Sequence, residues 1–241
     1  MKKQLLSVIL TSFMLSGLFA CDACRTYDND NFIITSAKVK HDARLQHTIW
    51  EIQVKGLAGA TTPKPAGKLD GAPVLGYVFP TNLKPTDVGF GETEGIVALA
   101  LTSHPDFDDT PLWDENGDRI YDNDGVVWHP HWVILVKDDR VKGGLAVKQF
   151  TPGDSSVTLP PTNPGMPMYM DSPGFQVVTK GNAIRVTVPD YRINHQVSFN
   201  FDAVACYMQV NTSDKSKPML GVKTVYSVAS GDLSLPYSVK E

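Results

Sequence analysis

Short segments that alternate apolar and polar residues recur along the chain. In the segment 50–55, the apolar residues Trp50, Ile52 and Val54 are separated by polar ones, and the segment 184–188 follows the same pattern. Successive side chains of a strand point to opposite faces of a sheet, so this period of two predicts strands with one buried face. The strands predicted in this way span 32–39, 47–55, 74–79, 96–101, 125–137, 144–149, 183–188, 204–210 and 222–228.

The segments between the predicted strands are rich in residues that favour turns. Gly, Pro, Asn, Asp and Ser cluster at 114–118, 137–144, 180–182 and 211–218, and such clusters are typical of turns and loops. No stretch keeps a helical apolar period over three turns. We therefore predict an all-β fold, an antiparallel β-sandwich with long loops.

A proline-rich segment at 151–173 bears on the domain organisation. Its six prolines disfavour regular strand pairing, so the segment either separates two lobes or forms one long loop. The second lobe would hold only about 65 residues, which is small for independent stability. We therefore predict a single β-sandwich domain over 32–241 that is crossed by this Pro- and Met-rich loop.

The N-terminus has the features of an export signal. Lys2 and Lys3 precede a mostly apolar stretch over 5–19. This stretch is shorter than the roughly 20 apolar residues that a membrane-spanning helix needs. It ends in Leu-Phe-Ala-Cys at 18–21, which resembles the lipobox of bacterial lipoproteins, where the cysteine is acylated before cleavage.

The resemblance implies that residues 1–20 are a signal peptide that is removed. Cys21 would then be the lipidated N-terminus, with palmitate among its acyl chains, and 21–31 would be a tether. Several acyl chains anchor a protein stably, because each buried methylene contributes about 0.8 kcal/mol. Asp22 is similar to the inner-membrane retention signal of such lipoproteins, which favours the periplasmic face of the inner membrane over the outer membrane. An ordinary secretory cleavage site is the alternative, but it needs a small residue where Leu18 stands.

Charge and cysteine content limit the chemistry of the exported domain. The net charge of −4 and the pI near 5.8 argue against nucleic acid as a partner, because phosphate binding needs clustered Lys and Arg. With Cys21 used by lipid, Cys24 and Cys206 remain in an oxidising compartment, where two thiols more often pair than stay free. The sequence therefore predicts a Cys24–Cys206 disulfide.

The densest chemical signal is the pair His129 and His131, which flank Pro130. In an extended chain both imidazoles point the same way, about 6.5–7 Å apart at Cβ, and such a pair can close on one metal ion. The alternative is a pair of hydrogen-bonded core histidines. A metal site needs at least one further ligand. The candidates for it are His104, then His195, His41 and His47.

Three methionines occupy alternate positions in the proline-rich loop: Met166, Met168 and Met170. Thioethers are soft ligands that select Cu(I), and an oxidising compartment favours methionine over cysteine for that task. The alternative is that they fill irregular gaps beneath the loop. If both clusters converge, copper is the favoured ion; if only the histidines converge, zinc or another ion with nitrogen ligands is favoured.

An acidic segment at 106–124 holds eight carboxylates against the single cation Arg119. Part of it is spaced like the opening of a calcium-binding loop. However, the sixth position is Arg119 and the twelfth is Gly125, whereas an EF-hand requires glycine and glutamate there. The two alternatives are a looser calcium loop and a plain hairpin turn with a solvated acidic rim. The candidate ligands of the calcium loop are Asp114, Asn116, Asp118, Asp122 and Asp124.

These observations lead to three functional hypotheses. The first is a membrane-anchored, exported lipoprotein that binds a transition metal, copper or zinc, without catalysis. The second is a metal-dependent enzyme on the same His-x-His site, which would need an open coordination position and a base such as Glu92 or Glu94. The third is a structural, ligand-binding or glycan-binding surface lipoprotein without metal. Exposed tryptophans would form a sugar-stacking platform for it, but the apolar neighbours of Trp50 and Trp132 predict burial instead. The candidate tryptophans are Trp50, Trp113, Trp128 and Trp132.

Overall fold

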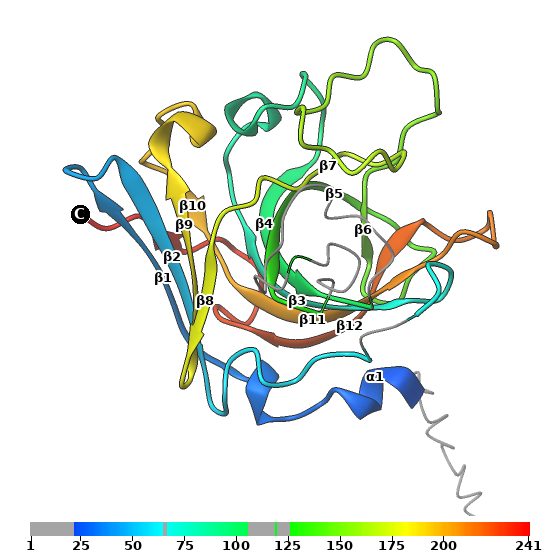
Figure 1. The fold of residues 1–241 in the computed structure, drawn as a ribbon, viewed down its shortest axis with the longest axis horizontal. Helices are drawn as coiled ribbons and strands as arrows, with labels where there is room; N and C mark the ends of the chain where they lie inside the picture. Colours follow the sequence, from blue (N-terminus) through cyan, green and yellow to red (C-terminus); the bar gives the residue numbers. More distant parts are fainter. Residues whose placement is uncertain (1–21, 65–66, 106–118, 120–125) are drawn as a thin grey trace, which may run out of the picture.

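The computed structural model describes residues 22–64, 67–105, 119 and 126–241, in which two large antiparallel sheets pack together (Figure 1). The first is a four-stranded sheet in the order β1-β2-β9-β8. Its strands are β1 (Ile34–Asp42), β2 (His47–Val54), β9 (Ala183–Pro189) and β8 (Val177–Lys180). The predicted Cys21 lipid site, Trp113 and the predicted calcium ligands lie outside the described residues.

The second sheet closes on itself. Its order is β4-β3-β11-β12-β6-β5-β7, and an additional pairing joins β4 to β5. We call the ring of β3, β4, β5, β6, β11 and β12 the closed sheet; Figure 1 looks into it. Its strands are β3 (Pro73–Pro80), β4 (Ile96–Ser103), β5 (His129–Lys137), β6 (Leu145–Val147), β11 (Val204–Val210) and β12 (Leu220–Val228), and β7 (Met170–Asp171) extends it beside β5.

Short elements complete the described part of the chain. The helical segments are α1 (Asp22–Thr26), η1 (Asp30–Phe32), η2 (Pro85–Val88) and η3 (Asp190–Ile193). The two-residue strands β10 (Asn200–Phe201) and β13 (Tyr237–Ser238) pair with each other. Among the described residues, no helix has both the length and the apolar character needed to cross a membrane.

The strands β3, β4, β5 and β11 of the closed sheet each contribute to two hydrophobic cores. On β4, Val97 and Leu99 belong to the core between the two sheets, whereas Ala98 and Ala100 belong to the core inside the ring. The core between the sheets is formed with residues of the four-stranded sheet such as Trp50. Burial on both faces explains why these strands are almost continuously apolar. The predicted all-β, sandwich-like single domain is confirmed.

The first described residues pack against the outside of the closed sheet. Cys24 is 3% exposed and belongs to the core between the sheets. Its carbonyl accepts a hydrogen bond of 2.8 Å from Tyr226 Oη, and the Asn31 carbonyl accepts one of 2.6 Å from Tyr77 Oη. The segment from residue 22 onward is therefore held on the domain by both apolar contacts and hydrogen bonds.

The predicted Cys24–Cys206 disulfide is wrong. Cys206 is a free, buried thiol and so does not pair with Cys24. Alternation along β11 turns Ala205 and Tyr207 outward and Cys206 into the ring, so the wall of the closed sheet separates Cys206 from Cys24. Burial raises the pKa of the Cys206 thiol to about 12.

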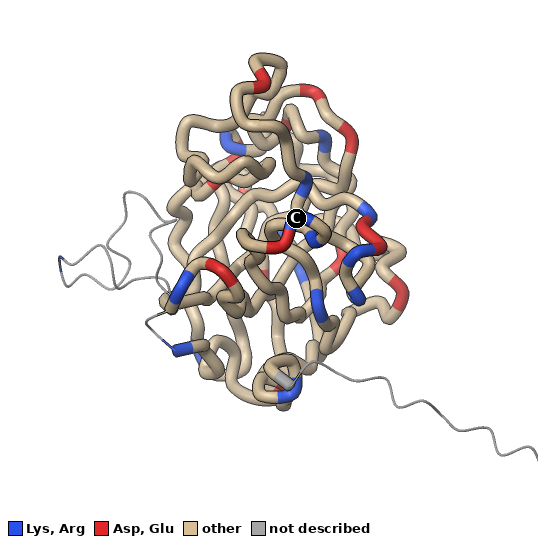
Figure 2. Tube along the Cα trace, turned by 90° about the vertical axis from the view of Figure 1, so that its right-hand side faces the viewer, with Lys and Arg blue, Asp and Glu red and all other residues tan. Residues whose placement is uncertain are grey.

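Charged residues of both signs are interspersed along the trace of the chain (Figure 2). Most of the described ion pairs are partly exposed, for example Lys55 with Asp30 at 3.1 Å, and such pairs contribute about 0–1 kcal/mol each. Apolar packing is therefore the main source of stability. The tryptophans Trp50, Trp128 and Trp132 are all at most 7% exposed and contribute to this packing, not to an exposed sugar-stacking surface.

We expect Leu99→Ala to lower the free energy of unfolding by about 2–5 kcal/mol, because Leu99 is fully buried between the two sheets. Leu45→Ala is the matched control. Leu45 is 62% exposed, so its truncation should change stability by less than about 0.5 kcal/mol. Urea denaturation followed by tryptophan fluorescence measures both variants. Equal effects would contradict the packing described above.

Candidate metal centre

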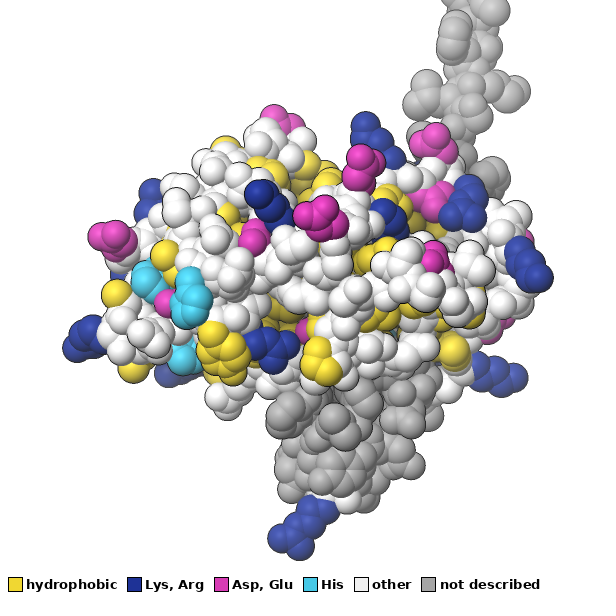
Figure 3. Space-filling view, turned by 90° about the horizontal axis from the view of Figure 1, so that it is seen from above, with side chains coloured by type: hydrophobic (Ala, Val, Ile, Leu, Met, Phe, Trp, Pro, Cys, Tyr) yellow, Lys and Arg dark blue, Asp and Glu magenta, His cyan; other side chains and the backbone are white. Residues whose placement is uncertain are grey.

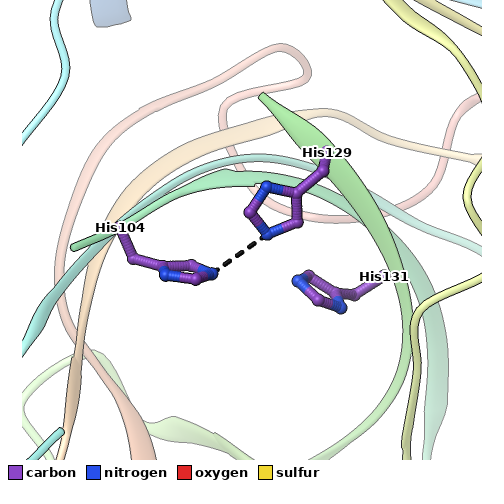
Figure 4. A group of neighbouring side chains, drawn as sticks. All are labelled: His104, His129 and His131. Atoms are coloured by element: carbon purple, nitrogen blue, oxygen red, sulfur yellow. Dashed lines mark hydrogen bonds between the residues drawn. The ribbon is translucent and has the colours of Figure 1, made fainter. Parts of the chain in front are cut away.

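The pairing of β4 with β5 brings three histidines together. In the antiparallel register, Thr102 lies opposite His129 and Ala100 lies opposite His131. Alternation points all four of these side chains into the ring, and His104, the residue directly after β4, continues the same side. Figure 4 shows the three imidazoles converging from the two strands on one region inside the closed sheet.

The histidine triad (His104, His129 and His131) is buried and tightly grouped. Each residue is 2% exposed, and one ring nitrogen from each lies within 4.8 Å of the others. The closest approach is 3.0 Å, between Nε2 of His104 and Nε2 of His129. An ion bound at about 2.0–2.1 Å from each nitrogen needs the nitrogens roughly 3–3.5 Å apart. Small side-chain rotations would therefore bring all three nitrogens onto one ion.

Two backbone carbonyls fix which nitrogen carries the proton in two of the rings. Nδ1 of His104 lies 2.9 Å from the Pro105 carbonyl oxygen, and Nδ1 of His129 lies 2.6 Å from the Val127 carbonyl oxygen. A carbonyl oxygen can only accept a hydrogen bond, so each Nδ1 is the donor. Each Nε2 then presents a lone pair, which is the form that ligates metals, and such outer partners are typical of metal-binding histidines.

Two lone pairs 3.0 Å apart repel each other unless a cation lies between them. The cation can be a proton or a metal ion. Burial, together with the neighbouring His104 and His131, lowers the pKa of His129 well below its usual value of 6.5, which disfavours a proton on His129. A metal ion at this point would bond to both nitrogens and needs no imidazolium, and the short distance between the two nitrogens suits it.

A hydroxyl from the proline-rich loop holds the third imidazole. Ser172 Oγ lies 3.0 Å from Nδ1 of His131, and Ser172 follows β7, which pairs with β5 through Trp132 and Val133. The loop is therefore tied to the strand that carries His129 and His131. Sequence reasoning missed Ser172, because nothing in its local sequence indicates that it would lie beside a histidine 41 residues away.

The triad borders a cavity of about 70 Å³ inside the closed sheet. His104 and His131 line it, and so do the three methionines singled out in the sequence: Met166, Met168 and Met170. The structure thus brings the histidine and methionine clusters to one cavity. Two further sulfur side chains line it that sequence reasoning did not select, Met208 and Cys206. Their signal is the alternation of β11, which turns both residues into the ring.

The other candidate histidines lie elsewhere. His41 and His47 are partly exposed and His195 is exposed. Figure 3 shows surface histidines grouped beside an acidic side chain. His41 Nε2 lies 2.8 Å from Asp190 Oδ2. These three residues are therefore not ligands of the buried centre, and of the four candidates for a third ligand the structure selects His104.

The two acids considered as catalytic bases are also remote from the triad. Glu92 and Glu94 are exposed and line a surface pocket together with Lys84 and Thr86. That pocket shares no lining residue with the cavity beside the histidines. Glu92 and Glu94, the examples given for the base that a metal-dependent enzyme would need, therefore do not line the cavity beside the histidines.

No family model, curated protein or solved structure matches this chain. Any account of its function therefore depends on the geometry of the closed sheet and on the chemistry of the side chains within it.

The buried state of His129 predicts a pH dependence for the metal-free protein. In the unfolded chain His129 binds a proton near pH 6.5, whereas the folded state resists it, so stability falls as the pH drops below 6.5. One such group gives a slope of at most about 1.4 kcal/mol per pH unit. We expect His129→Gln to reduce the slope measured by urea denaturation between about pH 6.5 and 4.5, and the exposed-site control His195→Gln to leave it unchanged. An unaltered slope in His129→Gln would show that folding does not lower the pKa of His129.

Proposed function

We propose that this protein is an exported, membrane-anchored metal-binding lipoprotein that holds a transition metal ion through Nε2 of His104, His129 and His131. The proposal rests on the 3.0 Å contact between Nε2 of His104 and Nε2 of His129. In each of these rings, Nδ1 donates its proton to a backbone carbonyl, so Nε2 carries a lone pair. That contact places two lone pairs on one point, and a metal ion is the ligand that turns their repulsion into two bonds.

Copper is the ion that the side chains favour. Imidazole binds several transition metals, but thioether sulfur selects soft ions such as Cu(I). Met166, Met168 and Met170 line the same cavity as His104 and His131. This convergence supports copper over zinc, which would use the nitrogen ligands alone.

The enclosure of the triad favours retention of the ion over turnover of a large substrate. All three histidines are 2% exposed and lie behind the wall of the closed sheet. Catalysis on an extended substrate needs an open cleft, whereas storage or transfer of an ion needs only its bonds and a passage for it. We therefore assign the centre to binding.

The proposed anchor is Cys21. The Leu-Phe-Ala-Cys sequence at 18–21 and the basic residues before the apolar stretch support cleavage and acylation there. Asp22 supports retention at the periplasmic face of the inner membrane. Export also accounts for a ligand set built on histidine and methionine, because thiols oxidise in such compartments.

The triad is tested by the double variant His129→Ala/His131→Ala. Loss of a residue that only hydrogen-bonds to a metal ligand typically weakens metal binding by about 10–100-fold. Loss of two ligands themselves should therefore weaken copper binding by more than about 100-fold. The measurement is competition with a Cu(I) chelator under reducing conditions, with the metal content of the purified protein determined in parallel and zinc as the comparison ion.

His195→Ala is the matched control for the triad, since it removes an exposed histidine of the same chain. It should retain one ion per chain with unchanged affinity. Circular dichroism confirms that both proteins are folded. Stoichiometric copper in the folded double variant would refute the proposed centre.

The anchor is tested by Cys21→Ser. We expect the wild-type protein in the membrane fraction and the variant in the soluble fraction or uncleaved, because serine cannot form the thioether that carries the lipid. Mass spectrometry of the N-terminal peptide identifies the acyl groups. A wild-type N-terminus that is unmodified, with cleavage before Cys21, would instead support an ordinary secretory signal.

A further inference from the structure

A cavity lies beside the triad and is lined by two of its members, His104 and His131. We infer that the bound ion keeps one coordination position directed into this cavity and accepts there a small uncharged molecule of two or three non-hydrogen atoms. This inference rests on the proposed metal centre and names the class of ligand that the centre takes in addition to its ion.

The three histidines approach from one side. They are carried by the end of β4 and the start of β5, which are adjacent strands of one wall, and their side chains point inward from it (Figure 4). The three nitrogen ligands come from one wall and leave the side of the ion that faces the cavity to a further ligand. An exogenous molecule would compete there with the thioethers of the methionines that line the same cavity. An ion with three histidines and one open position is the arrangement that binds exogenous ligands in metalloproteins.

The size of the cavity limits what can occupy that position. Its volume is about 70 Å³. A water molecule needs roughly 10–15 Å³ in a comparable measure, and an apolar cavity of about 150 Å³ holds benzene. The space beside the triad therefore fits a molecule of a few non-hydrogen atoms and is too small for an aromatic ring.

The walls of the cavity limit the charge of its occupant. Besides the two histidines, Thr102 and the sulfur side chains, the lining is mostly aliphatic, with Val74, Val133 and Leu220 among its residues. A charged group loses its hydration on entering such a site and finds few polar partners there. An uncharged diatomic or triatomic molecule carries no such penalty.

The cavity extends toward the surface of the closed sheet. Two of its lining residues, Val225 and Leu233, are 39% and 38% exposed. Small side-chain motions at this rim occur on the fast timescale of exposed rotamers. A molecule of two or three atoms can then reach the ion without separation of the strands.

Carbon monoxide is a suitable probe because it is uncharged, has two non-hydrogen atoms and binds Cu(I). The experiment loads the purified protein with Cu(I) under anaerobic conditions and titrates carbon monoxide, with the C–O stretch recorded by infrared spectroscopy. We expect one carbonyl per copper, saturable binding and a single narrow band, since the cavity offers one enclosed environment.

Two cavity-filling variants test whether the ligand lies in this space. Ala100 lines the cavity opposite His131 in the register, so Ala100→Leu should weaken carbon monoxide binding by at least about tenfold while copper stays bound. Val133→Ile adds a single methyl group to the same cavity and serves if the larger change disturbs folding. Val178→Ile is its matched control, because Val178 is 45% exposed on β8. This variant should change neither copper binding nor carbon monoxide binding.

The possible results separate the two proposals. Stoichiometric copper without a carbonyl band would overturn the inference and leave the metal centre intact. Equal binding of carbon monoxide to wild type, Ala100→Leu and Val133→Ile would also overturn the inference alone. Failure of the wild-type protein to hold copper or zinc would overturn the metal centre and this inference together.

Discussion

The hydrogen-bonded pairing of β4 with β5 is the constraint on which both the fold and the candidate centre depend. It converts an open sheet into a ring, so neither of these strands is left with an unpaired edge on the closing side. The same register sets His129 opposite Thr102 and carries His104 to within 3.0 Å of His129. A shift of one residue in this pairing would turn the histidines to the outer core, so closure and the centre are specified by one set of contacts.

Closure also gives the molecule two interiors of different character. The core between the sheets is rich in aromatic side chains, with Trp50 stacked on Phe199 and edge-on to Trp132. The core within the ring is aliphatic and sulfur-rich and retains a cavity. Large rigid rings fill the flat space between two sheets, whereas the curved inside of a narrow ring accommodates smaller and more flexible side chains. The outer core therefore supplies stability, and the inner one supplies a place where a ligand can lie.

Much of the fold is accessible from the sequence because alternation is a local property. It predicts the long strands, whereas β7, β8, β10 and β13, which have two to four residues, are too short for a period to be seen. The centre is only partly accessible. His129 and His131 share one strand, so their common direction follows from spacing alone, but the choice of His104 over three other histidines depends on the β4–β5 register. The side on which Cys206 lies depends on which face of β11 lines the ring, and this is why its predicted pairing with Cys24 is wrong.

Pro130, between the two histidines of β5, has a consequence for how the centre forms. It lies opposite Leu101 in the ladder, and its ring fixes φ near about −65° and removes one backbone donor. The chain between the two imidazoles thus has fewer conformations to lose when both are held in place. A site whose backbone is restricted before its ligand arrives keeps more of the binding free energy as affinity. The pyrrolidine ring of Pro130 therefore preorganises the backbone that carries His129 and His131.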